Sequence, residues 1–236
     1  MKIVVLTGAG ISAESGLATF RDADGLWEGH RPEDVATPEA FEADRALVQR
    51  FYDERRAALP RVQPNAAHRA LARLEAELGD DLFLVTQNID DLHERGGSRT
   101  VHHMHGELAV AWCVACDARR PWTGTLEDEP ACPGCGVAAL RPDVVWFGEM
   151  PYGMDRIHQA LFTCDLFVSI GTSGVVYPAA GFVDYALAGG SRTVELNLER
   201  AANSDFHVHR QGPATELVPA WVEEVVAELR SGADAI

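Results

Sequence analysis

The chain has 236 residues, and its 47% hydrophobic content suits one large domain or a domain with an insertion. The formal net charge is −16 and no basic cluster is present, so nucleic acid is not expected as a partner. The N-terminus lacks a signal-peptide pattern, and polar residues interrupt the longest apolar stretch, residues 166–188. We therefore expect a cytoplasmic protein that does not bind membranes.

The N-terminal segment combines a short buried strand with a glycine-rich turn. Residues 3–6 are apolar, as in a strand that is covered on both faces. Gly8 and Gly10 allow a sharp turn and a close approach of the backbone to a ligand, and Ser12 favours the start of a helix. Free amides at such a turn favour an anion such as pyrophosphate, although the same spacing also occurs in plain strand–helix turns.

The following loop, residues 19–27, mixes polar and aromatic side chains. Thr19, Phe20 and Arg21 stand close in sequence to Trp27. Such residues suit a loop that closes over a ligand, because aromatic rings exclude water and an arginine supplies fixed donors for phosphate or ribose. We therefore expect this loop to cover the ligand held by the glycine-rich turn.

Two helices are expected before the second strand. Residues 38–59 place apolar side chains at three- and four-residue steps. Within them Tyr52 and Arg55 lie three residues apart and share one face, a spacing that also fits a surface helix with a salt-bridged arginine. Asn65 is a good N-cap for a second helix that ends at Leu78, with Gly79 just beyond it.

Strands and helices alternate along the rest of the chain. The expected elements are, in order, strands at 82–86, 143–149 and 166–170, a helix at 177–187, a strand at 193–196 and a helix at 219–230. This order predicts an α/β fold with a doubly wound, mostly parallel, Rossmann-like sheet. Because ligands bind outside the carboxyl ends of parallel strands, a nucleotide cleft is predicted from the polar residues at 8–12, 87–90, 171–173 and 197–199.

Residues 102–107 read His-His-Met-His-Gly-Glu. Such a tract can bind a metal, but a better metal site follows it in the chain. His105, which precedes a glycine and follows a strand, is the better candidate for acid–base chemistry, because a histidine can be neutral or charged near pH 7.

Four of the five cysteines form two C-x-x-C pairs with fifteen residues between them: Cys113, Cys116, Cys132 and Cys135. Two such pairs bring four thiolates into a tetrahedron suited to zinc. Since protein fills all four positions, we expect a closed, structural zinc site in a small insertion. The acidic residues 127–129 between the pairs argue against nucleic-acid binding by this insertion, and Cys164 is left for the core.

These motifs, in this order, resemble those of the sirtuins, which are NAD-dependent protein-lysine deacylases. The resemblance covers nearly the whole chain and rests on the four cysteines and on residues 8–16, 19–22, 86–90, 105–106 and 171–173. Residues 63–68 and 146–151 are similar to the bacterial class III branch, which is related to mitochondrial sirtuin 5. In that branch a Tyr-x-x-Arg pair recognises the carboxylate of succinyl- or malonyl-lysine, which makes Tyr52 and Arg55 candidate acyl selectors.

The resemblance implies roles for individual residues. Those that would contact NAD are Gly8, Ala9, Gly10, Ser12, Ala13, Glu14, Thr19, Phe20, Arg21, Trp27, Gln87, Asn88, Ile89, Asp90, Gly171, Thr172, Ser173, Asn197, Leu198, Glu199 and Ala214. The catalytic group would be His105, with Asn88 and Asp90 shaping the nicotinamide pocket. The acyl-lysine and its peptide would contact Tyr52, Arg55, Val144, Val145, Trp146 and Phe147, the last four by strand addition.

The implied reaction removes succinyl or malonyl groups, and also acetyl groups, from lysine and consumes NAD. The acyl oxygen attacks the ribose carbon that bears nicotinamide, and His105 takes a proton from a ribose hydroxyl, which leads to O-acyl-ADP-ribose. Two alternatives are mono-ADP-ribosyl transfer to another acceptor and a non-enzymatic module that binds NAD or ADP-ribose. The Tyr52–Arg55 pair and His105 favour the deacylase.

We expect one catalytic domain over residues 1–236, which acts as a monomer on acylated protein substrates. Its Rossmann-like part would comprise approximately residues 1–30, 80–105 and 140–236. A small part would hold a helical segment at about 31–79 and the zinc ribbon at about 108–139.

Overall fold

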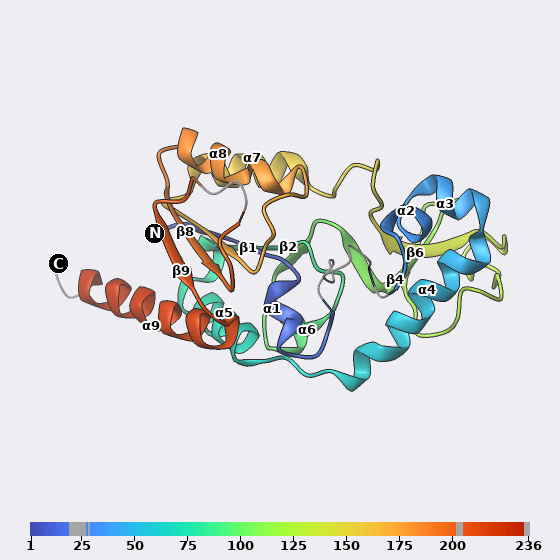
Figure 1. Ribbon diagram of the computed structural model, residues 1–236, viewed down its shortest axis with the longest axis horizontal. Coiled ribbons are helices and arrows are strands. Elements are labelled where there is room, and N and C mark those ends of the chain that lie inside the picture. The colour runs from blue at the N-terminus through green and yellow to red at the C-terminus, as the bar shows by residue number, and fades with distance from the viewer. Residues whose placement is uncertain (19–26, 28, 202–204, 234–236) are drawn as a thin grey trace.

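The computed structural model describes residues 1–18, 27, 29–201 and 205–233. Figure 1 shows a larger α/β part, which carries both ends of the described chain, and a smaller part at the right of the view. Within the described ranges, no helix is both long and apolar enough to cross a bilayer.

The larger part is built on a six-stranded sheet in which all neighbours pair in parallel. Its spatial order is β3 (Val101–His103), β2 (Leu82–Thr86), β1 (Ile3–Thr7), β7 (Leu166–Ile170), β8 (Arg192–Asn197), β9 (Val208–Gln211). The central strands β1 and β7 are buried along their whole length, as expected for strands covered on both faces. The strand order reverses between β1 and β7, and open α/β sheets bind ligands at the carboxyl side of such a reversal.

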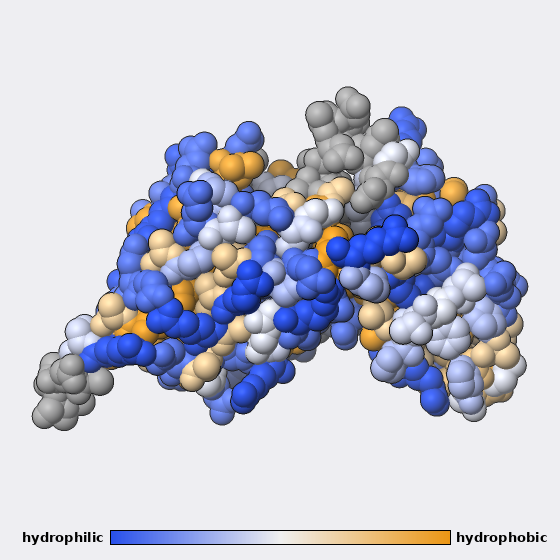
Figure 2. Space-filling view, turned by 90° about the horizontal axis from the view of Figure 1, so that it is seen from below, coloured by the Kyte–Doolittle hydropathy of each residue, from blue (hydrophilic) through white to orange (hydrophobic). Residues whose placement is uncertain are grey.

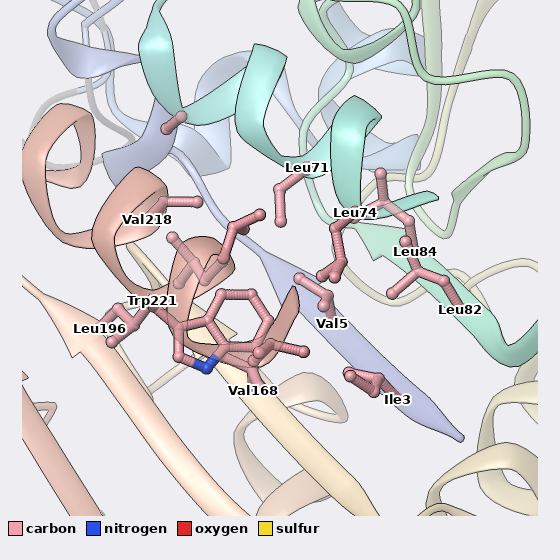
Figure 3. Close-up of a cluster of buried hydrophobic side chains, with 14 of the residues drawn as sticks. Ile3, Val5, Leu71, Leu74, Leu82, Leu84, Val168, Leu196, Val218 and Trp221 are labelled. Carbon is pink, nitrogen blue, oxygen red and sulfur yellow. The ribbon is translucent and has the colours of Figure 1, made fainter. Parts of the chain in front are cut away.

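Helices cover both faces of this sheet. One face carries α5 (Ala66–Leu78) and α9 (Ala214–Ala233), and the other carries α7 (Met154–Thr163) and α8 (Phe182–Ala188). Figure 3 shows Leu71 and Leu74 of α5 and Trp221 of α9 gathered over Val5 and Val168 of the sheet. Single-turn helices follow β1 and β2 at α1 (Gly10–Ala13) and α6 (Leu92–Arg95).

The smaller part joins three helices to an antiparallel sheet. The helices are α2 (Pro32–Val35), α3 (Pro38–Ala43) and α4 (Arg45–Ala58), and the sheet has the order β5 (Arg119–Pro121), β4 (Gly106–Cys113), β6 (Leu140–Val144). Phe51 and Tyr52 of α4 share a buried apolar cluster with Leu108 and Val144 of this sheet. The remaining regular elements are the 3-10 turns η1 (Leu59–Arg61), η2 (Gly79–Asp81) and η3 (Ala179–Gly181).

The surface is largely polar, as expected for a chain in which 24% of the residues are charged. Figure 2 shows a face that is mostly hydrophilic, with apolar residues in small groups, and a notch that separates the larger part from the smaller one. The six-stranded parallel sheet and the separate smaller part confirm the predicted α/β fold with a small insertion.

Several predicted elements occur with different ends. The helix expected at 38–59 is divided into α3 and α4, because Asp44 leaves the helical region (φ −145°, ψ 80°) and its carboxylate caps α4 by accepting the N–H of Leu47 at 2.9 Å. The strand expected at 143–149 lies at Leu140–Val144, and the helix expected at 177–187 consists of η3 and α8. The strands β3, β4, β5 and β9 and the helices α6 and α7 were not predicted.

The last helix begins at Ala214 and not at Pro219, which is an interior residue of α9. The actual N-terminus is capped from a distant part of the chain, because the Glu14 carboxylate accepts the N–H of Thr215 at 3.0 Å and its hydroxyl at 2.6 Å.

Helix α5 packs in the larger part. The sequence analysis had assigned it to the smaller part, whose helical segment was expected at about residues 31–79. Its buried residues Ala67, Leu71 and Leu74 lie in one cluster with Ile3 and Val5 of the central strand. The chain therefore returns to the larger part between α4 and α5, and not after α5.

Candidate functional site

A cavity of about 790 Å³ lies where the carboxyl ends of the parallel strands face the smaller part. Its lining includes all of the described residues that were predicted to bind NAD or the acyl-lysine, and the catalytic candidates: Gly8, Ala9, Gly10, Ser12, Ala13, Glu14, Trp27, Tyr52, Arg55, Gln87, Asn88, Ile89, Asp90, His105, Val144, Val145, Trp146, Phe147, Gly171, Thr172, Ser173, Asn197, Leu198, Glu199 and Ala214. Thr19, Phe20 and Arg21 lie outside the described residues. A fold-level reason for the convergence is that all four predicted strand-end segments meet at one edge of the sheet.

The glycines after β1 permit close packing of two strand-end loops. A Cβ atom on Gly10 would lie 2.7 Å from Cα of Gly171, and one on Gly8 would lie 2.8 Å from the carbonyl oxygen of Gly171. Backbone atoms cannot move aside cheaply, so the close approach requires glycine at both positions.

The amides of this turn differ from the expectation of free N–H groups around an anion. The N–H groups of Gly10, Ile11 and Ser12 donate to the carbonyl oxygens of Gly171, Gly8 and Ala9 at 2.9, 3.1 and 3.1 Å. Helix α1 has only four residues, so its dipole is small. The sequence pattern correctly located the turn, but packing against Gly171 occupies the N–H of Gly10, and bonds within the turn occupy those of Ile11 and Ser12.

A buried polar network forms part of the cavity wall. The Asn88 amide donates to Gly8 O and to Ser12 Oγ, both at 3.2 Å, and the Ser12 hydroxyl donates to Asp90 Oδ2 at 3.1 Å. Burial raises the pKa of the Asp90 carboxyl, while hydrogen bonds from the N–H of Leu92 and from Ser12 oppose this rise. The network fixes the orientation of both side chains and links the loop after β2 to the loop after β1.

His105 is held in one tautomer. Its Nδ1 lies 3.0 Å from the carbonyl oxygen of Gln87, which can only accept, so Nδ1 carries the proton. Burial lowers the pKa of His105, against a smaller opposing effect of this hydrogen bond. The ring is therefore neutral near pH 7 and its Nε2 holds a lone pair, as a general base requires.

The other two histidines of the tract have separate partners. His102 Nε2 donates to the carbonyl oxygen of Tyr152 at 2.9 Å. Both ring nitrogens of His103 donate, to Asn88 O at 3.0 Å and to Glu94 Oε1 at 2.8 Å. Burial is the largest single effect and lowers the pKa of His103, but the hydrogen bond to Glu94, the charge of Glu94 and the bond to Asn88 O together raise it. The tract is therefore not a shared metal site among the described residues.

Tyr52 and Arg55 reach the cavity from α4. The Tyr52 ring is fully buried, and its hydroxyl accepts the indole N–H of Trp146 at 3.1 Å. Arg55 lies with its guanidinium carbon 3.2 Å from the centre of the Phe51 ring and 5.2 Å from that of Trp27, and it donates to Phe51 O at 2.6 Å. The alternative of a plain surface helix does not hold at this turn of α4, because Tyr52 is buried and both residues line the cavity.

The four cysteines form the only group of possible metal ligands found among the described residues. Their sulfur atoms all lie within 4.8 Å of one another, with 3.7 Å between Cys113 and Cys135 and 3.8 Å between Cys116 and Cys132. Tetrahedral Zn–S bonds of about 2.3 Å place sulfur atoms about 3.8 Å apart, so the arrangement fits zinc. Backbone N–H groups of Cys135 and Gly134 lower the pKa of the Cys132 thiol to about 6, which favours the thiolate ligand.

Some cavity residues were missed by the sequence analysis. They come mainly from the smaller part and from the turn before α9, and include Ala36, Leu59, Val176, Tyr177, Arg200, Gly212 and Pro213. The Gly-Pro turn signal at 212–213 could have indicated the last two. Ala36 and Leu59 carry no such signal, because only the packing of the two parts brings them to the cavity.

Comparisons with known proteins agree with this site. The family model described as the Sir2 family matches residues 8–178. The chain is 56% identical over 238 residues to a protein of Escherichia coli (strain K12) named NAD-dependent protein deacylase, covering 99% of this chain and 85% of that protein. A protein of the same name from Caulobacter vibrioides is 58% identical, covering 97% of this chain and 98% of that protein.

Solved structures show the same fold. A complex of a Sir2 homologue with NAD is 40% identical with a TM-score of 0.87, covering 97% of this chain and 90% of the other. A Sir2 protein with a deacetylated p53 peptide and 3′-O-acetyl ADP-ribose is 29% identical with a TM-score of 0.82, covering 94% of this chain and 93% of the other. The family match over most of the chain, the identity to these relatives and the convergence of the predicted residues on one cavity show that the chain belongs to the Sir2 family.

Proposed function

We propose that the chain is an NAD-dependent protein-lysine deacylase that prefers succinyl and malonyl groups and also removes acetyl groups. Two relatives more than 50% identical are named NAD-dependent protein deacylase, and the cavity combines strand-end loops with a neutral histidine. The observation that carries the acyl preference is that Tyr52 and Arg55 line the same cavity as His105.

NAD is a consumed substrate in this proposal. The loops after β1, β7 and β8 would hold its phosphates, riboses and adenine, because they line one continuous cavity. Asn88 and Asp90 would shape the pocket for nicotinamide, and their shared bonds to Ser12 would keep that pocket in one conformation. The complex of NAD with the Sir2 homologue supports this assignment.

The proposed chemistry begins when the acyl oxygen of the modified lysine attacks the ribose carbon that bears nicotinamide, and nicotinamide leaves. His105 Nε2 then takes a proton from a ribose hydroxyl, whose oxygen attacks the acyl carbon. Mass balance requires one water to release free lysine together with O-acyl-ADP-ribose. The peptide of the solved Sir2 complex supports an acylated protein as the second substrate, which we place beside Val144–Phe147.

Tyr52 and Arg55 would read the carboxylate at the end of a succinyl or malonyl group. A guanidinium and a phenol can bind a carboxylate together, and hydrogen bonds to charged groups contribute about 1.5 to 3 kcal/mol each. The Tyr52 hydroxyl accepts from Trp146, which leaves its own proton for an acceptor in the cavity. An acetyl group has no carboxylate and would not use either residue.

The four cysteines would hold a structural zinc that orders the smaller part, since no ligand position is left for water or substrate. We also propose that the chain acts as a monomer.

The decisive experiment compares succinyl-, malonyl- and acetyl-lysine peptides of one sequence with NAD, and follows deacylated peptide and acyl-ADP-ribose by mass spectrometry. Arg55→Met and Tyr52→Phe should raise KM for the succinyl peptide about tenfold or more, with little change for the acetyl peptide.

Acetyl removal alone, indifferent to Arg55, would leave a deacylase but refute the acyl preference. Nicotinamide release with ADP-ribose transferred to protein would indicate the alternative transferase. A protein that binds NAD without consuming it with any peptide would be a binding module.

A further inference from the structure

Helix α4 carries the proposed acyl-reading pair and also contacts the loop between the two C-x-x-C pairs. Asp53, directly after Tyr52, points its carboxylate into that loop. Its Oδ2 accepts three hydrogen bonds, from Thr125 Oγ1 at 2.6 Å, from the N–H of Leu126 at 2.7 Å and from the N–H of Glu127 at 3.0 Å. One side chain therefore holds three consecutive residues of the loop.

The other oxygen of Asp53 is held by a buried arginine of the same helix. Arg56 Nη1 donates to Asp53 Oδ1 at 2.5 Å, and the two side chains are 5% and 13% exposed. Arg56 also donates to Leu108 O at 2.8 Å and to Gly124 O at 3.3 Å. The pair thus joins α4 both to β4 and to the loop, and because it is buried, water screens it little.

The loop in turn is packed on the metal-binding cysteines. Leu126 is fully buried in a cluster with Cys113, Cys132 and Leu140. Its N–H group binds Asp53 while its side chain contacts the cysteine cluster. A continuous path of contacts therefore runs from the cysteines through Leu126 and Asp53 to the helix turn that holds Tyr52 and Arg55.

We propose that Asp53 is a positioning residue for acyl recognition, which sets Tyr52 and Arg55 at a fixed place relative to the four-cysteine centre. The metal-binding part would then contribute to the choice of acyl group, in addition to stabilising the fold. This inference rests on the proposed function of Tyr52 and Arg55 as readers of a carboxylate.

The expected consequence is selective. Tyr52 and Arg55 must be held closely in place, because the hydroxyl of one and the guanidinium of the other have to bind the two oxygens of one carboxylate. The short acetyl group makes no such contact. A loosened α4 should therefore weaken binding of succinyl peptides, with the loss in KM and not in kcat, and leave acetyl turnover nearly unchanged.

The test compares three variants of the full chain with NAD and matched succinyl and acetyl peptides. Asp53→Ala removes all four hydrogen bonds, and Asp53→Asn keeps one acceptor oxygen and should recover part of the effect. Glu54→Gln is the matched control, because Glu54 is the exposed carboxylate next to Asp53 on the same helix. Zinc content is measured by mass spectrometry, together with the chelator concentration that removes half of the zinc.

We expect Asp53→Ala to raise KM for the succinyl peptide about tenfold or more, with kcat and the acetyl kinetics within about twofold and one zinc retained per chain. Because coupling between two sites is reciprocal, succinyl peptide should also raise the chelator concentration needed to remove zinc from the unchanged protein, and should do so less in Asp53→Ala.

Other outcomes separate the two proposals. An unchanged succinyl-to-acetyl ratio in Asp53→Ala, or an equal loss on both peptides, would overturn the role of Asp53 and leave the deacylase intact. If the unchanged protein shows no succinyl preference, the acyl assignment fails and the inference fails with it. If Asp53→Ala does not fold, the same measurements on Asp53→Asn test whether Asp53 positions Tyr52 and Arg55.

Discussion

At the scale of single residues, the protonation state of His105 depends on one backbone contact and on burial. The carbonyl of Gln87 selects the tautomer with the proton on Nδ1, and burial keeps the ring neutral. His103, only two positions earlier, has a raised pKa because Glu94 and a backbone carbonyl accept from both of its nitrogens. The sequence singled out His105 as the acid–base candidate of the tract, and the partners of each ring show why the pKa values of His103 and His105 shift in opposite directions.

This difference predicts the pH dependence of activity. Because the pKa of His105 is lowered from 6.5, the proposed base stays neutral until the pH falls below 6.5, so kcat/KM should decline on the acid side with an apparent pKa below 6.5. His105→Ala should lower kcat by about 10²- to 10⁴-fold and abolish this limb.

The profile is measured with saturating NAD from pH 5 to 9. His158→Gln serves as the control, since His158 stacks on Tyr185 in the larger part and is not among the cavity residues. An acid limb that persists at the same midpoint in His105→Ala would assign it to another group.

At the scale of elements, helix ends depend on partners both near and far in the sequence. Asn65 caps α5 by accepting the N–H of Ala67 at 2.9 Å, which the sequence predicted from a local pattern. The same side chain donates to Ile11 O at 2.8 Å and to Ser15 Oγ at 3.0 Å, which no local pattern could show. Asn65 therefore joins α5 to the turn after β1.

Two substitutions separate these roles of Asn65. Asn65→Asp keeps the capping oxygen but loses both donors, and should lower the free energy of unfolding by about 1 to 2 kcal/mol. Asn65→Ala also loses the cap and should cost about 1 kcal/mol more. Because the turn after β1 lines the cavity, both variants should raise KM for NAD.

Denaturant unfolding and NAD kinetics check this prediction. Equal costs of the two variants would show that the cap contributes nothing, and a native-like Asn65→Asp would show that the donors contribute nothing.

At the scale of the whole molecule, burial of two histidines beneath the sheet edge makes stability depend on pH. Burial, with a smaller effect of Arg69, lowers the pKa of His68 to about 4, and burial lowers the pKa of His93 well below its usual value. His93 Nε2 lies 2.9 Å from the hydroxyl of Thr7, and the two rings lie 5.0 Å apart in an edge contact. Both rings are therefore neutral in the folded protein near pH 7.

The sign of the effect follows from proton binding. Between pH 6.5 and about 4 the unfolded chain takes up a proton at His68 and the folded chain does not, so the free energy of unfolding falls as the pH falls. At 1.36 kcal/mol per pKa unit, His68 alone contributes about 3 kcal/mol of loss by pH 4. Because the pKa of Asp90 is raised in the folded protein, protonation of Asp90 makes the free energy of unfolding rise as the pH falls. This opposing contribution is the same in the unchanged protein and in the variant.

His68→Gln should be less stable than the unchanged protein at pH 7.5, but its stability should fall less steeply below pH 6.5. Urea unfolding at a series of pH values between 4 and 8 measures both slopes. Parallel curves for the two proteins would mean that His68 does not cause the acid loss.

The sequence by itself determined the features that depend on residues close together in the chain. The parallel α/β pattern, the glycine-rich turn, the Asn65 cap and the four-cysteine spacing are local, because dihedral preferences, capping and short ligand spacings act over a few residues. The cavity residues at the four strand ends could be proposed because the carboxyl ends of parallel strands meet at one edge of a sheet, whereas the roles of Tyr52, Arg55 and Ala214 were implied by the resemblance to the sirtuins.

Only the tertiary structure decided what depends on contacts between distant residues. It assigned α5 to the larger sheet and moved the start of α9 to a cap from Glu14. It also bonded the N–H of Gly10 to Gly171 O and brought Tyr52 of α4 into the cavity of His105. It also set the protonation of His68, His103 and His105, which share a usual pKa in the unfolded chain. The physical reason is that burial and long-range hydrogen bonds arise only when separate segments pack together.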